Sequence, residues 1–139
     1  MRGLIIREPW IGMILAGQKS WEMRSKPTSY RGRVGLIRKG TGMVVGIAEI
    51  VDSLAPVDRA SFQAAHGRHG ILADQEAEVL REGWIYPWVL MGVKALMRPV
   101  FAGQKPGAVT WVTLSPVTIS KLENEYGRSS TLKAREIAR

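Results

Sequence analysis

The 139-residue chain contains no cysteine. This absence excludes disulfide bonds, thiolate metal ligands and a cysteine nucleophile, and it fits a reducing compartment, so we expect a cytoplasmic protein. The sequence also lacks any run approaching the roughly 18 apolar residues of a membrane helix, and we expect no membrane partner. Near the N-terminus, the apolar stretch is broken at residues 7–9 and is too short for the core of a signal peptide.

Positive charge is concentrated in the first third of the chain. Of the 20 Lys and Arg residues, nine lie in residues 1–45 beside two acidic residues, which gives +7 of the total net charge of +8. Residues 46–100 carry a net charge of −2 and residues 101–139 a net charge of +3. This asymmetry indicates an anionic partner for the N-terminal part, and nucleic acid is the commonest such partner of a basic domain.

The spacing of apolar residues predicts a single α+β domain, since 139 residues with 45% hydrophobic content can bury one core. Alternating patterns predict strands over residues 3–7, 20–24, 33–38, 43–51, 86–91, 93–99 and 109–114. Helical spacing predicts helices over residues 9–16, 59–66 and 74–82. We expect a small β-barrel of five to six strands with flanking short helices. The tail over residues 118–139 is expected to be a surface helix or partly disordered.

The segment Gly17-x-Lys19-x-x-Glu22-x-Arg24 is the strongest candidate for chemistry. In an extended strand, Glu22 and Arg24 point to one face, beside the helix end that delivers Lys19. In a cleft, Lys19 would bind a phosphate, or act as a base or nucleophile where burial and Arg24 lower its pKa. Glu22 would orient water or hold Arg24. The alternative is a structural ion pair on a solvated strand face.

Four further pieces accompany this motif: a first helix ending in I-L-x-G-x-K, the piece R-G-x-x-x-L, the strand GIAEIVD and the later YPWVL. With them, the chain resembles the ASCH domain family, named for homology to a transcription coactivator. The resemblance covers about residues 2–115 and implies a PUA-like β-barrel with a cleft, so we expect an ASCH domain over residues 1–117. ASCH proteins are thought to act in RNA recognition, and some members look like hydrolases, including ribonucleases and an acetylcytidine amidohydrolase.

The chain departs from the amidohydrolase members at Glu22, where they carry a hydroxyl residue. Ser20 and Ser25 are nearby, but neither occupies that position. We therefore favour RNA binding with cleavage of single-stranded RNA, which needs cations on the phosphate and a base near the sugar hydroxyl. Two alternatives stay open: a pocket for a modified nucleoside, with an amidohydrolase-like activity, and a non-catalytic RNA-binding module in RNA metabolism or translation regulation.

A basic cleft is predicted around this motif. Arg31 and Arg33 are expected to share a strand face, and the turn that follows Lys39 offers two glycines that can approach a phosphate. Ordinary surface charge on a strand edge is the alternative. Of the five tryptophans, Trp88, with its neighbour Tyr86, is the candidate for the cleft wall, against a packing role. The predicted catalytic residues are Lys19, Glu22 and Arg24, and the predicted nucleic-acid-binding residues are Lys19, Arg24, Arg31, Arg33, Lys39, Tyr86 and Trp88.

His66 and His69 have a spacing that would present both rings to one metal on a helix, but the flanking glycines favour a loop and no carboxylate cluster accompanies them. We expect a mobile loop with two titratable rings. A histidine general acid that reaches over the cleft is the alternative. No metal ligands are predicted, and whether a divalent metal takes part in a reaction stays open.

Overall fold

The computed structural model describes residues 1–103 and 106–138, and this part of the chain is an α+β fold, as predicted. No helix within it is long and apolar enough to span a bilayer. In chain order, the elements are β1 (Arg2–Ile6), α1 (Trp10–Leu15), β2 (Trp21–Arg24), β3 (Gly32–Arg38), β4 (Met43–Ser53), α2 (Arg59–Ala64), α3 (His66–His69), α4 (Glu76–Arg81), β5 (Tyr86–Phe101), β6 (Trp111–Thr113) and α5 (Pro116–Ala138).

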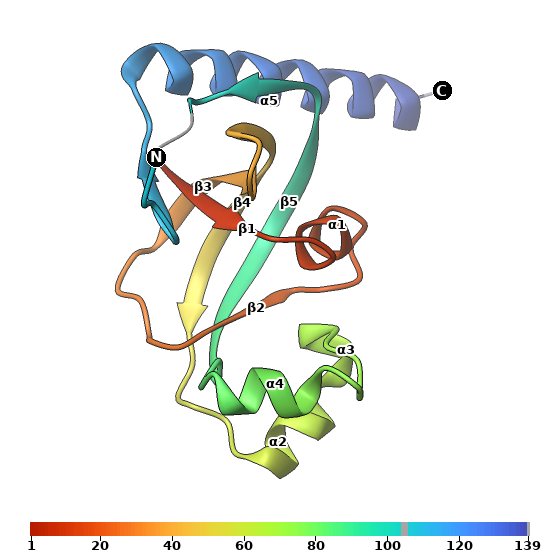
Figure 1. Cartoon of the computed structure of the whole chain (residues 1–139). Coiled ribbons are helices and arrows are strands. Elements are labelled where there is room, and N and C mark those ends of the chain that lie inside the picture. The colour runs from red at the N-terminus through yellow and green to blue at the C-terminus, as the bar shows by residue number, and fades with distance from the viewer. Residues whose placement is uncertain (104–105, 139) are drawn as a thin grey trace.

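The six strands form one curled sheet, a half-barrel, in the order β2-β5-β4-β3-β1-β6 (Figure 1). β1 and β3 are parallel, and the other neighbouring pairs are antiparallel. A parallel pair needs a crossover connection, which here contains α1 and β2. Helix α5 lies across one end of the sheet, whereas α2, α3 and α4 gather at the opposite end. The connection through α1 and β2 therefore places the Lys19 segment in the body of the domain.

Strand β5 is one strand of 16 residues, so the prediction of separate strands over 86–91 and 93–99 was wrong. Gly92, between them, has a φ of 61°, a conformation open mainly to glycine. The register explains the continuity: Met91 pairs with Glu49 and Lys94 with Ile47, so β5 carries one extra residue at this point. The glycine marks a β-bulge, which bends the strand without ending it.

Two clusters of buried side chains hold the helices to the sheet. The larger one joins α1, through Ile11 and Ile14, to the sheet and to Phe62 of α2. The smaller one contains Leu122 of α5, which is fully buried. The tail therefore begins as a helix that is anchored in the core.

The segment His66–His69 forms the short helix α3, so the prediction of a mobile loop was wrong. The His69 side chain is buried, and its ring stacks on Phe62 with 4.1 Å between the centroids. Its Nδ1 accepts a hydrogen bond from the Ile71 N–H at 2.9 Å, so Nε2 carries the proton and donates to the Phe62 carbonyl at 2.7 Å. Burial lowers the pKa of His69, and the ring stays neutral at pH 7. Apolar neighbours close in the fold, rather than the glycines beside it, decide its environment.

Truncation of Leu122 to alanine should lower the free energy of unfolding by about 2–4 kcal/mol, because it leaves a cavity at a fully buried position. Urea denaturation followed by tryptophan fluorescence measures this change. The matched control is Val117→Ala on the same helix, where the side chain is 65% exposed and the expected change is below about 0.5 kcal/mol. Equal losses in the two variants would contradict the anchoring of α5 through Leu122.

Candidate nucleic-acid site

The turn after α1 brings Lys19 into the interior. Gly17 has a φ of 79°, which ends the helix in the left-handed conformation and turns the chain toward β2. At the next residues, the Ser20 N–H donates to the Arg68 carbonyl at 2.9 Å, and the Leu90 N–H donates to the Ser20 carbonyl at 2.8 Å. The segment that carries Lys19 is therefore held between α3 and β5.

Lys19 is a buried cation, with 2% of its surface exposed. Its Nζ donates to the His69 carbonyl at 2.5 Å and lies 3.8 Å from Glu22 Oε1. Burial lowers the pKa of Lys19 to about 8, because the attraction of Glu22 offsets only part of the lost hydration and Arg24 lowers the pKa further.

Glu22 and Arg24 project from the same face of β2, as predicted, and form an ion pair. The Glu22 side chain is 5% exposed, and its Oε2 accepts a hydrogen bond from Arg24 Nη2 at 2.9 Å. The same Nη2 donates to the Ile5 carbonyl on β1 at 2.6 Å. Lys19, Glu22 and Arg24 therefore form one cluster, which we call the buried ion cluster. Because Lys19 and Glu22 are buried, the alternative of a pair on a solvated strand face does not hold.

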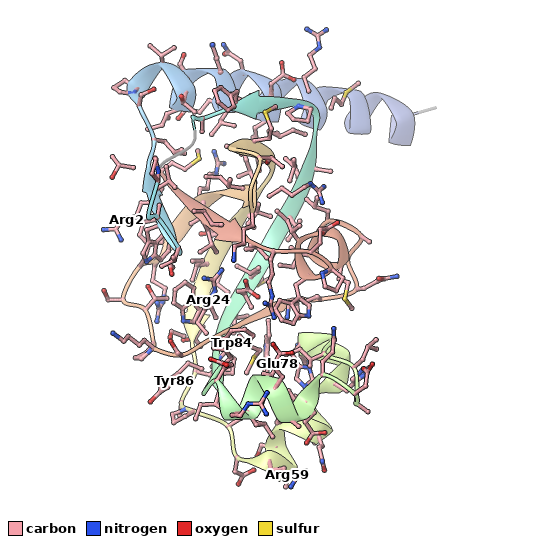
Figure 2. All side chains as sticks on the ribbon, in the orientation of Figure 1. Arg2, Arg24, Arg59, Glu78, Trp84 and Tyr86 are labelled. Atoms are coloured by element: carbon pink, nitrogen blue, oxygen red, sulfur yellow. The ribbon has the colours of Figure 1, made fainter. Side chains whose placement is uncertain are left out.

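A pocket of about 250 Å³ opens at this cluster and is called the site pocket here. Its charged and aromatic lining residues are Arg7, Trp10, Glu22, Arg24, Lys39 and Trp84, and the hydroxyl residues Ser25 and Thr110 also line it. Figure 2 shows Arg24 near β1 and β2, with Trp84 toward the α4 side of the same region. Lys19 is not a lining residue, so it acts on the pocket through Glu22. Of the predicted site residues, Glu22, Arg24 and Lys39 line the pocket.

Two lining residues, Arg7 and Trp84, were missed by the sequence analysis. The Arg7 Cζ lies 4.4 Å from the ring centroid of Trp10 and 4.9 Å from that of Trp84. The two indoles are nearly perpendicular, with 5.8 Å between their centroids. Cation–π contacts on two rings hold the guanidinium in place at the pocket wall. The tryptophan content was a signal for this site, but Arg7 and Trp84 are far apart in the chain and only the fold joins them.

Arg31 and Arg33 lie elsewhere and do not share a strand face. Arg31 precedes β3, and its Nη1 donates to the carbonyls of Thr28 and Tyr30 at 2.8 and 2.9 Å. Arg33 lies on β3, with its Cζ 4.5 Å from the ring centroid of Tyr126 on α5. Neither residue lines the site pocket. The prediction that both contribute to one basic face was therefore wrong.

Trp88 is 3% exposed and packs inside the domain. Its ring stacks on Trp111 with 5.5 Å between the centroids, and its Nε1 donates to the Lys26 carbonyl at 2.9 Å. Tyr86 pairs with Arg24 in the register of β5 and β2. Neither aromatic residue lines the site pocket, so the structure gives Trp88 the packing role that was its alternative. The indoles that border the pocket are those of Trp10 and Trp84, and Trp88 lies beneath it, with its ring centroid 5.6 Å from Arg24 Cζ.

The described part of the chain contains no group of three or more His, Asp and Glu residues that could hold a metal ion. The carboxylate that lines the site pocket, Glu22, is already paired with Arg24. The pocket's own residues can stabilise negative charge with guanidinium and ammonium groups, and they offer the Glu22 carboxylate as a proton acceptor and the hydroxyls of Ser25 and Thr110.

The lowered pKa of Lys19 predicts a pH-dependent stability. In the folded protein Lys19 loses its proton near pH 8, and in the unfolded chain near pH 10.5, so the unfolded state binds more protons between these values. The free energy of unfolding of the wild type, relative to Lys19→Met, should therefore rise from pH 8 to pH 10.5, by about 3 kcal/mol. Urea denaturation across this pH range measures the difference.

Lys26→Met provides the control, since Lys26 is exposed and the variant should track the wild type at every pH. A difference between wild type and Lys19→Met that stays flat from pH 8 to pH 10.5 would contradict the lowered pKa.

Comparison with known proteins places the chain in a family. The ASCH domain model matches residues 4–114. The structure is similar to the crystal structure of ASCH from Zymomonas mobilis, with a TM-score of 0.66 and 18% identity over 88% of this chain and 93% of that one. Two single-residue mutants of the same Zymomonas mobilis protein also match. Each has a TM-score of 0.67, the identities are 18% and 17%, and they cover 88% of this chain and 96% and 94% of theirs.

No curated protein matches the chain. At 17–18% identity, the likeness to the solved structures shows the fold alone, and it confirms the predicted PUA-like architecture. The family assignment rests instead on the sequence model, whose match extends from β1 through β6 and includes the buried ion cluster. The chain belongs to the ASCH domain family.

Proposed function

We propose that this protein binds single-stranded RNA by taking one nucleotide into the site pocket. The observation that carries this proposal is the composition of the pocket, which combines three cations, Arg7, Arg24 and Lys39, with the indole of Trp84 in about 250 Å³. Phosphates require cations, and unpaired bases bind to aromatic faces. A space of this size suits one nucleotide rather than a folded RNA. The association of ASCH domains with RNA supports the same assignment.

The structure suggests a role for each of these groups. Arg24 is fixed by bonds to Glu22 and Ile5, which leaves its other N–H groups for a phosphate. Arg7 is held against Trp10 and Trp84, so a ligand does not have to order it. The partly exposed ring of Trp84 offers a surface for a base, and such stacking contributes roughly 1–3 kcal/mol. The site pocket thus offers fixed guanidinium groups, of Arg7 and Arg24, to a phosphate and the indole of Trp84 to a base.

Cleavage of the bound strand is a second candidate function, favoured by the position of Glu22 in the pocket beside Arg24. In this reaction, Glu22 takes the proton of the ribose 2′-hydroxyl, and O2′ attacks the phosphorus atom and expels the 5′-oxygen of the next nucleotide. The leaving 5′-oxygen takes a proton from water, so the products are a 2′,3′-cyclic phosphate and a 5′-hydroxyl, and the hydroxide that remains is neutralised by the proton on Glu22. Arg24 stabilises the added negative charge. Lys19 is a positioning residue, because it reaches the pocket only through Glu22.

Binding is tested with a fluorescently labelled single-stranded RNA of about eight nucleotides. Arg24→Ala should weaken binding at least tenfold, because it removes a phosphate contact and releases Glu22. The matched control is Arg33→Ala, which removes the same charge at a position outside the site pocket. We expect this control to change the dissociation constant less than threefold, as measured by fluorescence anisotropy at several salt concentrations.

Thermal unfolding of Arg24→Ala and Arg33→Ala checks that both variants keep the fold.

Trp84→Ala should also weaken binding, by roughly 5-fold to 100-fold, and it leaves the buried ion cluster intact. Equal effects of Arg24→Ala and Arg33→Ala, or binding that does not change with salt, would contradict RNA binding at the site pocket.

Cleavage is tested on the same RNA with wild type and Glu22→Gln, with and without divalent metal and chelator. Glu22→Gln keeps the size of the side chain but cannot accept a proton, so we expect cleavage to fall at least a hundredfold while RNA binding stays within threefold. Binding without cleavage by the wild type would make the protein a non-catalytic binding module. Release of acetate from acetylcytidine, with no RNA cleavage, would favour the amidohydrolase alternative instead.

A further inference from the structure

We propose that the RNA site continues past Lys39 into a second pocket, so that the ligand is a strand of at least two nucleotides whose linking phosphate lies at Lys39. This inference rests on the proposed function, because it takes the first nucleotide to be in the site pocket. It adds a second nucleotide subsite, which we call the neighbouring pocket, and it distinguishes an RNA strand from a free nucleoside as the ligand.

The neighbouring pocket has a volume of about 280 Å³ and adjoins the site pocket. Ile5 and Lys39 line both pockets, so the two spaces meet at these side chains. The rest of the described lining of the neighbouring pocket comes from the end of β3, the turn between β3 and β4, the connection from β5 to β6 and β6 itself. It comprises Ile37, Gly40, Gly42, Gly103, Pro106, Ala108 and Val112. The two pockets are therefore neighbours that share Ile5 and Lys39 as lining residues.

Lys39 has the properties of a phosphate ligand at this boundary. Its backbone N–H donates to the Ile6 carbonyl at 3.0 Å, which fixes the start of the turn, while its side chain is exposed. Among the side chains that the structure describes, those of residues 1–103 and 106–127, no carboxylate forms an ion pair with Lys39, whereas Arg24, Arg31 and Arg38 each have a carboxylate partner. The charge of Lys39 is therefore available to a ligand, and a phosphate there would release bound counterions.

The chemistry of the neighbouring pocket indicates which part of a nucleotide it takes. Apart from Lys39, its described lining is apolar or glycine, so it suits a ribose and a base rather than a second phosphate. Gly40 and Gly42 have φ values of 85° and 67° and carry no side chain, so a sugar can approach the backbone closely. The described lining includes no aromatic side chain, so this subsite should accept any base.

The test compares uridine with a uridine dinucleotide that contains one linking phosphate, by NMR titration of the full chain. The dinucleotide should bind at least tenfold more tightly than uridine, and it should perturb the signals of Trp84 and of Ala108 and Val112. Uridine should perturb the Trp84 indole signal alone. Both ligands lack a terminal phosphate, so the difference reports the linking phosphate and the second nucleoside.

Two variants separate these contributions. Lys39→Ala should remove most of the gain for the dinucleotide, and the measured quantity is the ratio of the dinucleotide affinity to the uridine affinity in each variant. Ala108→Leu fills the neighbouring pocket and leaves all charges in place, and it should also remove most of the affinity gain of the dinucleotide over uridine. Lys121→Ala is the matched control, because it removes an exposed lysine that lines neither pocket. If Ala108→Leu does not fold, Lys39→Ala and the signal changes at Val112 still decide the question.

The outcomes distinguish this inference from the proposed function. Equal affinities for uridine and the dinucleotide, with changes at Trp84 and none at Val112, would overturn the second subsite and leave RNA binding at the site pocket in place. A gain for the dinucleotide that persists in Lys39→Ala would also overturn it. If neither ligand affects Trp84, the proposed function fails and the second subsite fails with it.

Discussion

The site depends on one physical constraint, the burial of a lysine ammonium beside a carboxylate. Lys19 bonds to the His69 carbonyl on α3, and Glu22 on β2 bonds to Arg24, which reaches the Ile5 carbonyl on β1. These contacts connect three elements that are distant in sequence. Burial of two charges costs several kcal/mol per ion and is offset only where the geometry satisfies both. The buried ion cluster therefore depends on the surrounding fold for its hydrogen-bond partners. Its contacts also hold Glu22 and Arg24 in place at the pocket wall.

This arrangement separates the cations into two kinds. Arg24 is committed to Glu22 and to a carbonyl, so its position is set before any ligand arrives. Lys39 is exposed and has no carboxylate partner among the described residues, so its charge acts on whatever lies next to it. A rigid guanidinium gives orientation and a free ammonium gives attraction. The site pocket therefore combines a cation of fixed position with a cation whose charge is not neutralised by a described carboxylate.

The sequence predicted the class of the fold and the pairing of Glu22 with Arg24 on one strand face, for physical reasons. Glu22 and Arg24 are two apart in a strand, so their common face follows from local geometry. The predictions that failed depended on distant contacts. Whether Gly92 ends a strand or forms a bulge depends on how β5 pairs with β4. Whether His69 lies in a mobile loop or is buried depends on its packing against Phe62. Arg33 was expected in the cleft because its charge is visible in the sequence, whereas its contact with Tyr126 is not.

The same limit explains why Arg7 and Trp84 were missed, although they shape the pocket. Arg7 follows β1 and Trp84 precedes β5, and neither position carries a local signal. Their role in the pocket depends on the contact of the Arg7 guanidinium with two indoles. This contact forms only when the fold brings α1 next to the loop after α4. A guanidinium held in this way keeps its charge and loses its freedom before binding, which lowers the entropy cost of holding an anion. The helices α2, α3 and α4 thus serve the site by delivering Trp84 and the His69 carbonyl to it, rather than by adding charge.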